Sequence, residues 1–80
     1  MKDHIETIAA CQSMQLTASA LLGDLSANPE YLNHPEYRDL VERVYMAARQ
    51  AAHVARILRD ERTANFTDTI CERLTEKAYL

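Results

Sequence analysis

Apolar residues recur at helical spacing through the middle of the chain, over residues 36–62. On a helical wheel with about 100° per residue, one stripe follows the i, i+3, i+4, i+7 spacing of a face that packs against a core. The members of this stripe are Leu40, Val44, Ala47, Ala51, Val54 and Leu58. The pattern predicts a long amphipathic helix with this stripe facing inward.

A second apolar band lies beside the first and consists mostly of alanine. Its members are Tyr37, Val41, Ala48, Ala52 and Ala55. The two bands together cover roughly half of the helix, which is more than the ~100° that one neighbouring helix covers. An 80-residue chain also has a marginal core. We therefore expect a homodimer. The residues expected to mediate this self-association are Val41, Ala48, Ala52 and Ala55.

The polar face of the same segment carries arginine with little acid nearby. No Asp or Glu occurs between Glu42 and Asp60. Tyr and Arg are the residue types most enriched in interface hot spots, so this face is predicted to bind a partner. The predicted partner-binding residues are Tyr45, Arg49, His53 and Arg56. The alternative is that acidic residues of the flanking segments pair with these arginines inside the fold.

The first third of the chain predicts another long helix, over residues 3–27. Asp3 followed by Glu6 resembles a capping box at its start. Its apolar stripe consists of Ile5, Ile8, Cys11, Gln15, Ala18, Leu22 and Leu25. Gly23 costs up to ~1 kcal/mol inside a helix, so an end near Leu22 is the alternative. We favour the longer helix because Leu25 continues the stripe.

Two proline motifs separate the first helix from the central one. The pair Asn28-Pro29 ends the first helix, because a residue before proline is pushed out of the α region. The motif Pro29-Glu30-Tyr31 predicts a single turn. Its repeat, Pro35-Glu36-Tyr37, begins the central helix, since proline suits the first helical position.

The apolar pattern changes phase after Leu58, which predicts a break in the chain. We place this break at residues 63–65, with Asn65 as the cap of a short third helix over residues 66–78. The alternative is an unbroken helix that reaches a second subunit.

The composition fits a small globular protein, with 48% hydrophobic and 26% charged residues and a net charge of −3. We predict one all-α domain over residues 1–80, with two long antiparallel helices and a short third helix, completed by dimerisation. The start of the chain has no signal-peptide pattern and no segment is apolar enough to span a membrane. A cytoplasmic location is therefore expected.

Candidate chemistry is sparse in this sequence. His4, His34 and His53 fall in different predicted elements and lack metal-binding spacing. Cys11 and Cys71 are interpreted as buried free thiols. The single glycine excludes a glycine-rich phosphate loop. No catalytic residue, cofactor or metal is predicted, and the chain is not expected to be an enzyme.

The remaining function class is contact with another macromolecule. The sequence predicts a non-catalytic protein-interaction module, a small regulator or inhibitor of a larger protein complex. Proteins of this size are often encoded by phages and mobile elements, which is an analogy of class only. The alternative is a nucleic-acid-associated accessory protein that uses the arginines of the central helix, although the chain is acidic overall.

Overall fold

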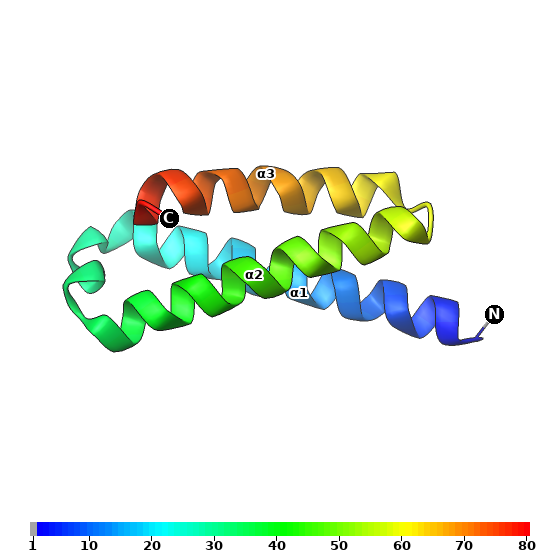
Figure 1. Cartoon of the computed structure of the whole chain (residues 1–80), viewed down its shortest axis with the longest axis horizontal. Helices are drawn as coiled ribbons and strands as arrows, with labels where there is room; N and C mark the ends of the chain where they lie inside the picture. Colours follow the sequence, from blue (N-terminus) through cyan, green and yellow to red (C-terminus); the bar gives the residue numbers. More distant parts are fainter. Residues whose placement is uncertain (1) are drawn as a thin grey trace.

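In a computed structural model, the described residues form three α-helices that pack on one another (Figure 1). The structure describes the backbone of residues 2–80 and the side chains of residues 5–80. Helix α1 spans Lys2–Ala27, the 3₁₀ turn η1 spans Pro29–Asn33, α2 spans Pro35–Ile57 and α3 spans Glu61–Ala78. Helix α2 runs antiparallel to α1 and α3, and the molecule measures 44 × 19 × 17 Å. The all-α prediction is confirmed.

Helix α1 follows the longer of its two predicted versions and ends at Ala27. Leu25 is 1% exposed, so the apolar stripe does continue into the core beyond Leu22. Gly23 lies on the exposed side of the helix, where a side chain would meet nothing within 4 Å. The predicted capping role of Asp3 concerns a side chain outside the described residues.

The connection between α1 and α2 forms as the two proline motifs predict, with a single turn followed by a new helix. Tyr37, at the start of α2, donates a 3.1 Å hydrogen bond to a carboxylate oxygen of Asp24 in α1. Its ring also packs edge-on against Tyr31, with 5.3 Å between ring centres. Burial and the bond to Asp24 raise the pKa of Tyr37 to about 12. These contacts tie the end of α1 to the start of α2.

The inward face of α2 is the alanine band, which corrects the prediction that this band is a self-association surface. Val41, Ala48, Ala52 and Ala55 are all 0% exposed, because α1 and α3 cover this side of α2 from two directions. Leu40, which belongs to the stripe predicted to face inward, is 48% exposed. One helix cannot cover so wide an apolar arc, but two helices of the same chain cover most of it.

Helix α3 begins earlier than predicted, at Glu61, because Asp60 is the residue that caps it. The Asp60 carboxylate accepts a 3.2 Å hydrogen bond from the backbone N–H of Thr63. The predicted cap, Asn65, lies inside the helix. The preceding turn places Arg59 at φ 65° and lets the Asp60 N–H donate to the Ala55 carbonyl at 2.8 Å. This is the geometry of a Schellman motif, formed here without glycine.

Small side chains dominate the interior. The larger cluster of buried residues consists of Ala18, Leu25, Val41, Ala48, Ile70, Cys71, Leu74 and Ala78. A smaller one consists of Cys11, Ala55 and Ala64. Thr67 is fully buried, and its hydroxyl donates a 2.7 Å hydrogen bond to the Thr63 carbonyl. No buried polar side-chain atom of the described residues lacks a partner, so burial leaves none of these side-chain groups uncompensated.

Substitution of Ala48 by leucine tests which face of α2 is inward. We expect Ala48→Leu to lower the free energy of unfolding by about 1–3 kcal/mol, because the added atoms have no space in a closely packed core. Ala51→Leu is the matched control on the same helix, where the side chain is only half-buried, and it should cost clearly less. Chemical denaturation measures both. Equal losses at the two positions would contradict this assignment of the inward face.

Candidate functional site

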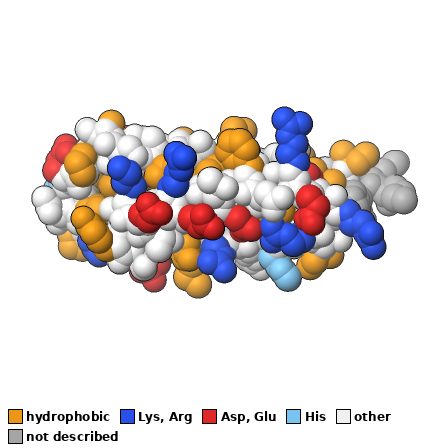
Figure 2. Space-filling view, turned by 90° about the horizontal axis from the view of Figure 1, so that it is seen from above, with side chains coloured by type: hydrophobic (Ala, Val, Ile, Leu, Met, Phe, Trp, Pro, Cys, Tyr) orange, Lys and Arg blue, Asp and Glu red, His pale blue; other side chains and the backbone are white. Residues whose placement is uncertain are grey.

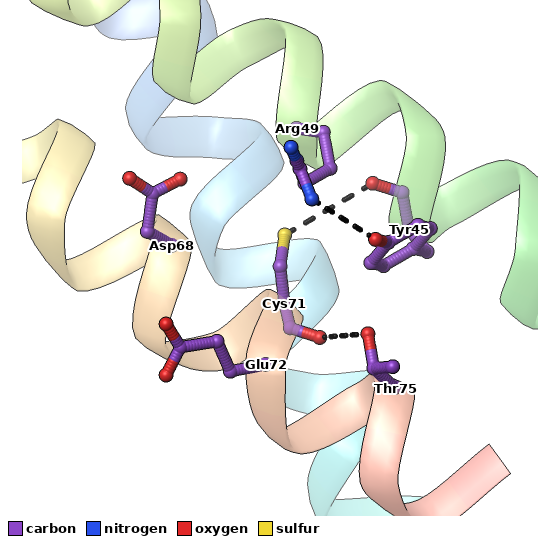
Figure 3. A pocket seen from close by; sticks show the side chains of 6 residues that line it. All are labelled: Tyr45, Arg49, Asp68, Cys71, Glu72 and Thr75. Atoms are coloured by element: carbon purple, nitrogen blue, oxygen red, sulfur yellow. Dashed lines mark hydrogen bonds between the residues drawn. The ribbon is translucent and has the colours of Figure 1, made fainter. Parts of the chain in front are cut away.

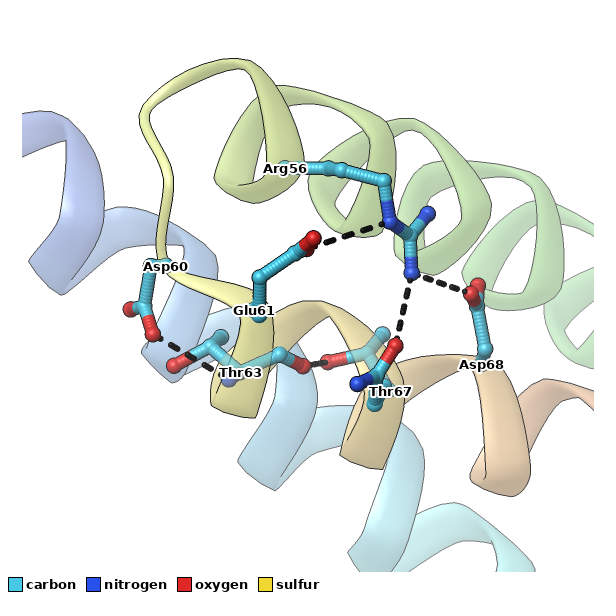
Figure 4. A network of polar contacts seen from close by, with 7 residues as sticks. Arg56, Asp60, Glu61, Thr63, Thr67 and Asp68 are labelled. Atoms are coloured by element: carbon cyan, nitrogen blue, oxygen red, sulfur yellow. Dashed lines mark hydrogen bonds and ion pairs between the residues drawn. The ribbon is translucent and has the colours of Figure 1, made fainter.

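The four predicted partner-binding residues of α2 have different roles in the structure. Arg56 is paired with side chains of α3 and helps to hold the two helices together. Its guanidinium donates to Asp68 at 2.9 Å and to the side-chain oxygen of Asn65 at 3.0 Å, both on α3 (Figure 4). Its Nε lies 3.5 Å from a carboxylate oxygen of Glu61. The hydrogen bond to Asp68 is the main reason why the pKa of Arg56 is raised. Internal pairing, the alternative stated above, therefore holds for Arg56.

Tyr45 and Arg49 stay together on the α2 surface. Arg49 donates a 3.1 Å hydrogen bond to the Tyr45 hydroxyl, and its guanidinium carbon lies 5.8 Å from the centre of that ring. Both residues border a cavity of about 230 Å³ between α2 and α3 (Figure 3). The other lining residues are Asp68, Cys71, Glu72 and Thr75. His53 is exposed and does not line this cavity.

Acidic side chains lie on both sides of α3, whereas its basic side chains line the cavities toward α1. The edge toward α2 carries Glu61, Asp68 and Glu72. The side toward α1 carries Arg62, Arg73 and Lys77 together with Asp60, Glu72 and Glu76. Figure 2 looks onto the α3 side of the molecule and shows a row of acidic side chains with basic ones on both sides. Glu61 and Asp68 pair with Arg56 of α2, whereas the α1 side of α3 carries cations and carboxylates together.

Helix α1 presents an uncharged surface to this side of α3, since residues 7–23 contain no charged side chain. Leu16 on α1 is 67% exposed and Phe66 on α3 is 56% exposed, and both line one cavity of about 360 Å³. A second cavity of about 550 Å³ lies further along the same two helices, beside Leu22 and Arg73. We call the surface that contains both cavities the α1–α3 groove.

A further depression, the α1–α2 groove, has no charged residue in its lining and a volume of about 330 Å³. It is lined by Thr7, Ala10, Cys11, Met14, Ala47, Gln50, Ala51 and Val54. Three of these, Ala47, Ala51 and Val54, belong to the stripe predicted to face the core. Part of that stripe is therefore only half-buried and borders an open apolar surface.

The sequence pattern does not predict Leu16 or Phe66 as surface residues. Leu16 lies outside the apolar stripe of the first helix, and Phe66 begins the apolar spacing of the third, which indicates a core position. One sequence signal does point to this surface. A long helix on the outside of a globular protein normally has a charged outer face, and residues 7–23 have none.

The two thiols fit the interpretation as buried cysteines. Cys11 is 5% exposed and Cys71 is 2% exposed, and neither forms a disulfide. Burial is the main reason why the pKa of each thiol is raised, so the reactive thiolate is disfavoured at neutral pH. Among the side chains that the structure describes, no three metal-ligating groups cluster.

No protein-family model, curated protein or solved structure matches this chain. Function is therefore inferred from the surfaces themselves. Within residues 2–80, no helix has the length and apolar character needed to cross a membrane.

Separate alanine substitutions of Arg49 and Arg56 test whether only Arg56 contributes to the stability of the fold. We expect Arg56→Ala to lower the melting temperature slightly, because it leaves Asp68 and Glu61 without their cation. The shift should shrink at high salt, since these exposed pairs are screened. Arg49→Ala should leave the melting temperature unchanged, because Arg49 bonds only to a hydroxyl of its own helix. Equal melting temperatures for the two variants would contradict the different roles assigned to Arg49 and Arg56.

Proposed function

We propose that this protein is a non-catalytic protein-interaction module that acts as a small regulator or inhibitor of a larger protein complex. The observation that carries the proposal is the pair of exposed apolar side chains Leu16 and Phe66, which line one cavity beside the uncharged segment of α1. Large apolar side chains that are exposed side by side are candidate contact sites on a protein surface.

The nucleic-acid alternative receives less support from the geometry of α2. Asp68 and Glu61 already engage Arg56, and Glu72 lines the same cavity as Arg49. A phosphate backbone that approached these arginines would meet carboxylates at the same place, whereas phosphate binding depends on a clear excess of positive charge.

Affinity purification from the native host tests the proposal with a matched pair of variants. The groove variant is Leu16→Glu with Phe66→Glu. The control is Met46→Glu with Ile57→Glu, because these two side chains are similarly exposed, at 62% and 63%. We expect one protein to be recovered with the unmodified chain and with the control, and lost with the groove variant, while circular dichroism shows all three folded. Recovery that does not depend on Leu16 and Phe66, or no enrichment over the tag alone, would overturn the proposal.

We also propose that the chain forms a homodimer, with the α1–α2 groove as the contact surface in place of the buried alanine band. Two copies related by a twofold axis bring the same residues together, and a groove lined by uncharged residues allows this without repulsion between like charges. The small core of an 80-residue chain favours such an assembly.

A single charge at the edge of the α1–α2 groove tests the homodimer. Ala10 is exposed and lines this groove, whereas Ala20 is exposed on the same helix outside it. We expect sedimentation velocity at micromolar concentration to give twice the 9.1 kDa chain mass for the unmodified protein and for Ala20→Glu. Ala10→Glu should sediment as the single chain. A 9.1 kDa species for every protein would rule out the dimer.

A further inference from the structure

The short turn between α2 and α3 holds a strained residue. Only Leu58, Arg59 and Asp60 connect the two helices, and Arg59 has φ 65°, in the left-handed region. A side chain makes this conformation unfavourable, because its Cβ comes too close to the following carbonyl oxygen. Glycine is the usual residue at this position of a Schellman motif. The turn therefore contains strain that a connection with glycine would not have.

The local sequence favours a continuous helix through this turn. Residues 36–80 contain neither glycine nor proline, and Leu58 and Arg59 are of residue types that favour helix. In a continuous helix, the first N–H groups of α3 would bond to the last carbonyl groups of α2, which otherwise lack partners within their own helices. These bonds would replace those that the Asp60 N–H and the Asp60 carboxylate make in the turn. The turned form thus depends on the packing of α3.

The packing of α3 can be provided by a second copy of the chain. The buried residues of α3 lie against α1 and α2, and Arg56 on α2 bonds to Asn65 and Asp68 on α3. Helix α3 of another copy presents the same side chains and can make the same contacts. The two arrangements then differ mainly in the conformation of the connection.

We propose that residues 58–60 act as a hinge at which two copies of the chain exchange α3. In the exchanged dimer, α2 and α3 of each copy form one continuous helix, and α3 of each copy packs on α1 and α2 of the other. Short connections under strain favour such an exchange, because the strain exists only in the unexchanged chain.

This exchange differs from the homodimer proposed through the α1–α2 groove. Contact through the groove joins two complete bundles, and it is reversed by dilution. Exchange requires α3 to leave a core that includes Ile70, Cys71 and Leu74. It is therefore slow in the folded protein and takes place when chains refold together at high concentration. The variant Ala10→Glu, which is designed to remove the groove contact, isolates the exchange.

Refolding of the Ala10→Glu chain tests the exchange. Chains denatured in guanidinium chloride are refolded at millimolar or micromolar concentration, brought to the same micromolar concentration and separated at once by size-exclusion chromatography. We expect a species of twice the 9.1 kDa chain mass only after refolding at millimolar concentration. It should persist after dilution, because its separation requires α3 to unfold from the partner. A single 9.1 kDa species under both conditions would refute the exchange.

Glycine and alanine at position 59, which differ by one methyl group, test the hinge in the same experiment. Arg59→Gly relieves the strain of the turn and disfavours the continuous helix, so we expect its dimer fraction to be roughly tenfold or more below that of Arg59→Ala. The control is the same pair of substitutions at Arg43, which is exposed within α2, and these two variants should form equal dimer fractions. Equal fractions for Arg59→Gly and Arg59→Ala would show that the turn is not the hinge.

Two chains that each carry a charge in the core test whether α3 comes from the other copy. Ala52→Asp places an unpaired carboxylate in α2 and Leu74→Asp places one in α3, both at fully buried positions, so each variant alone is strongly destabilised. When the two refold together, exchange assembles one bundle from α1 and α2 of the Leu74→Asp chain and α3 of the Ala52→Asp chain. This bundle contains neither substitution. We expect circular dichroism to show a melting transition close to that of the unmodified chain only in this mixture.

The control mixture is Ala48→Asp with Ala52→Asp. Both substitutions lie in α2, so every exchanged bundle still contains one of them and no such transition should appear. Absence of the transition from the first mixture, or its presence in the control, would overturn the proposal. The groove homodimer is judged separately by sedimentation of Ala10→Glu, and the interaction function by recovery of a partner through Leu16 and Phe66.

Discussion

Close packing along the alanine side of α2 is the contact on which the rest of the structure depends. Val41, Ala48, Ala52 and Ala55 are all fully buried between α1 and α3. Because three of these side chains end at Cβ, neighbouring helices can approach near the short end of the usual interaxial range of about 8–10 Å. Such close contact lets a chain of 80 residues bury a core made largely of small side chains. The larger apolar residues Leu40 and Met46 remain exposed.

The position of α3 against this alanine side also determines where its charges lie. Once Ala64, Cys71 and Leu74 are buried, Glu61 and Asp68 lie beside Arg56 of α2, and Arg62, Arg73 and Lys77 line the cavities toward α1. The first set meets Arg56, which forms two ion pairs with it. The second set meets an uncharged helix. The same packing thus brings Arg56 into ion pairs on the α2 side of α3, while on the α1 side cations and carboxylates line the same cavities without an ion pair among the described residues.

The exposed surface of α1 follows from its sequence in a different way. A helix without charge over 17 residues has no strongly polar face that must turn outward. Its orientation is set by Cys11, Ala18 and Leu25, which are buried against the other two helices. Leu16 remains 67% exposed and lines the cavity that also contains Phe66 of α3. We infer that an exposed face of this composition is kept for contact with a further molecule.

The sequence by itself determined the all-α class, the end of α1, the single turn at Pro29 and the start of α2 at the second proline, because these depend on local backbone preferences. It did not determine which of two adjacent apolar bands faces inward, since a wide apolar arc has no unique centre until both neighbouring helices are in place. It also did not locate the α2–α3 turn, where Arg59 adopts a conformation that usually indicates glycine. Only the tertiary structure separated Arg56, which is paired across helices, from Arg49. Only the tertiary structure placed Leu16 beside Phe66, because the distance between residues on different helices is not encoded in the periodicity of either one.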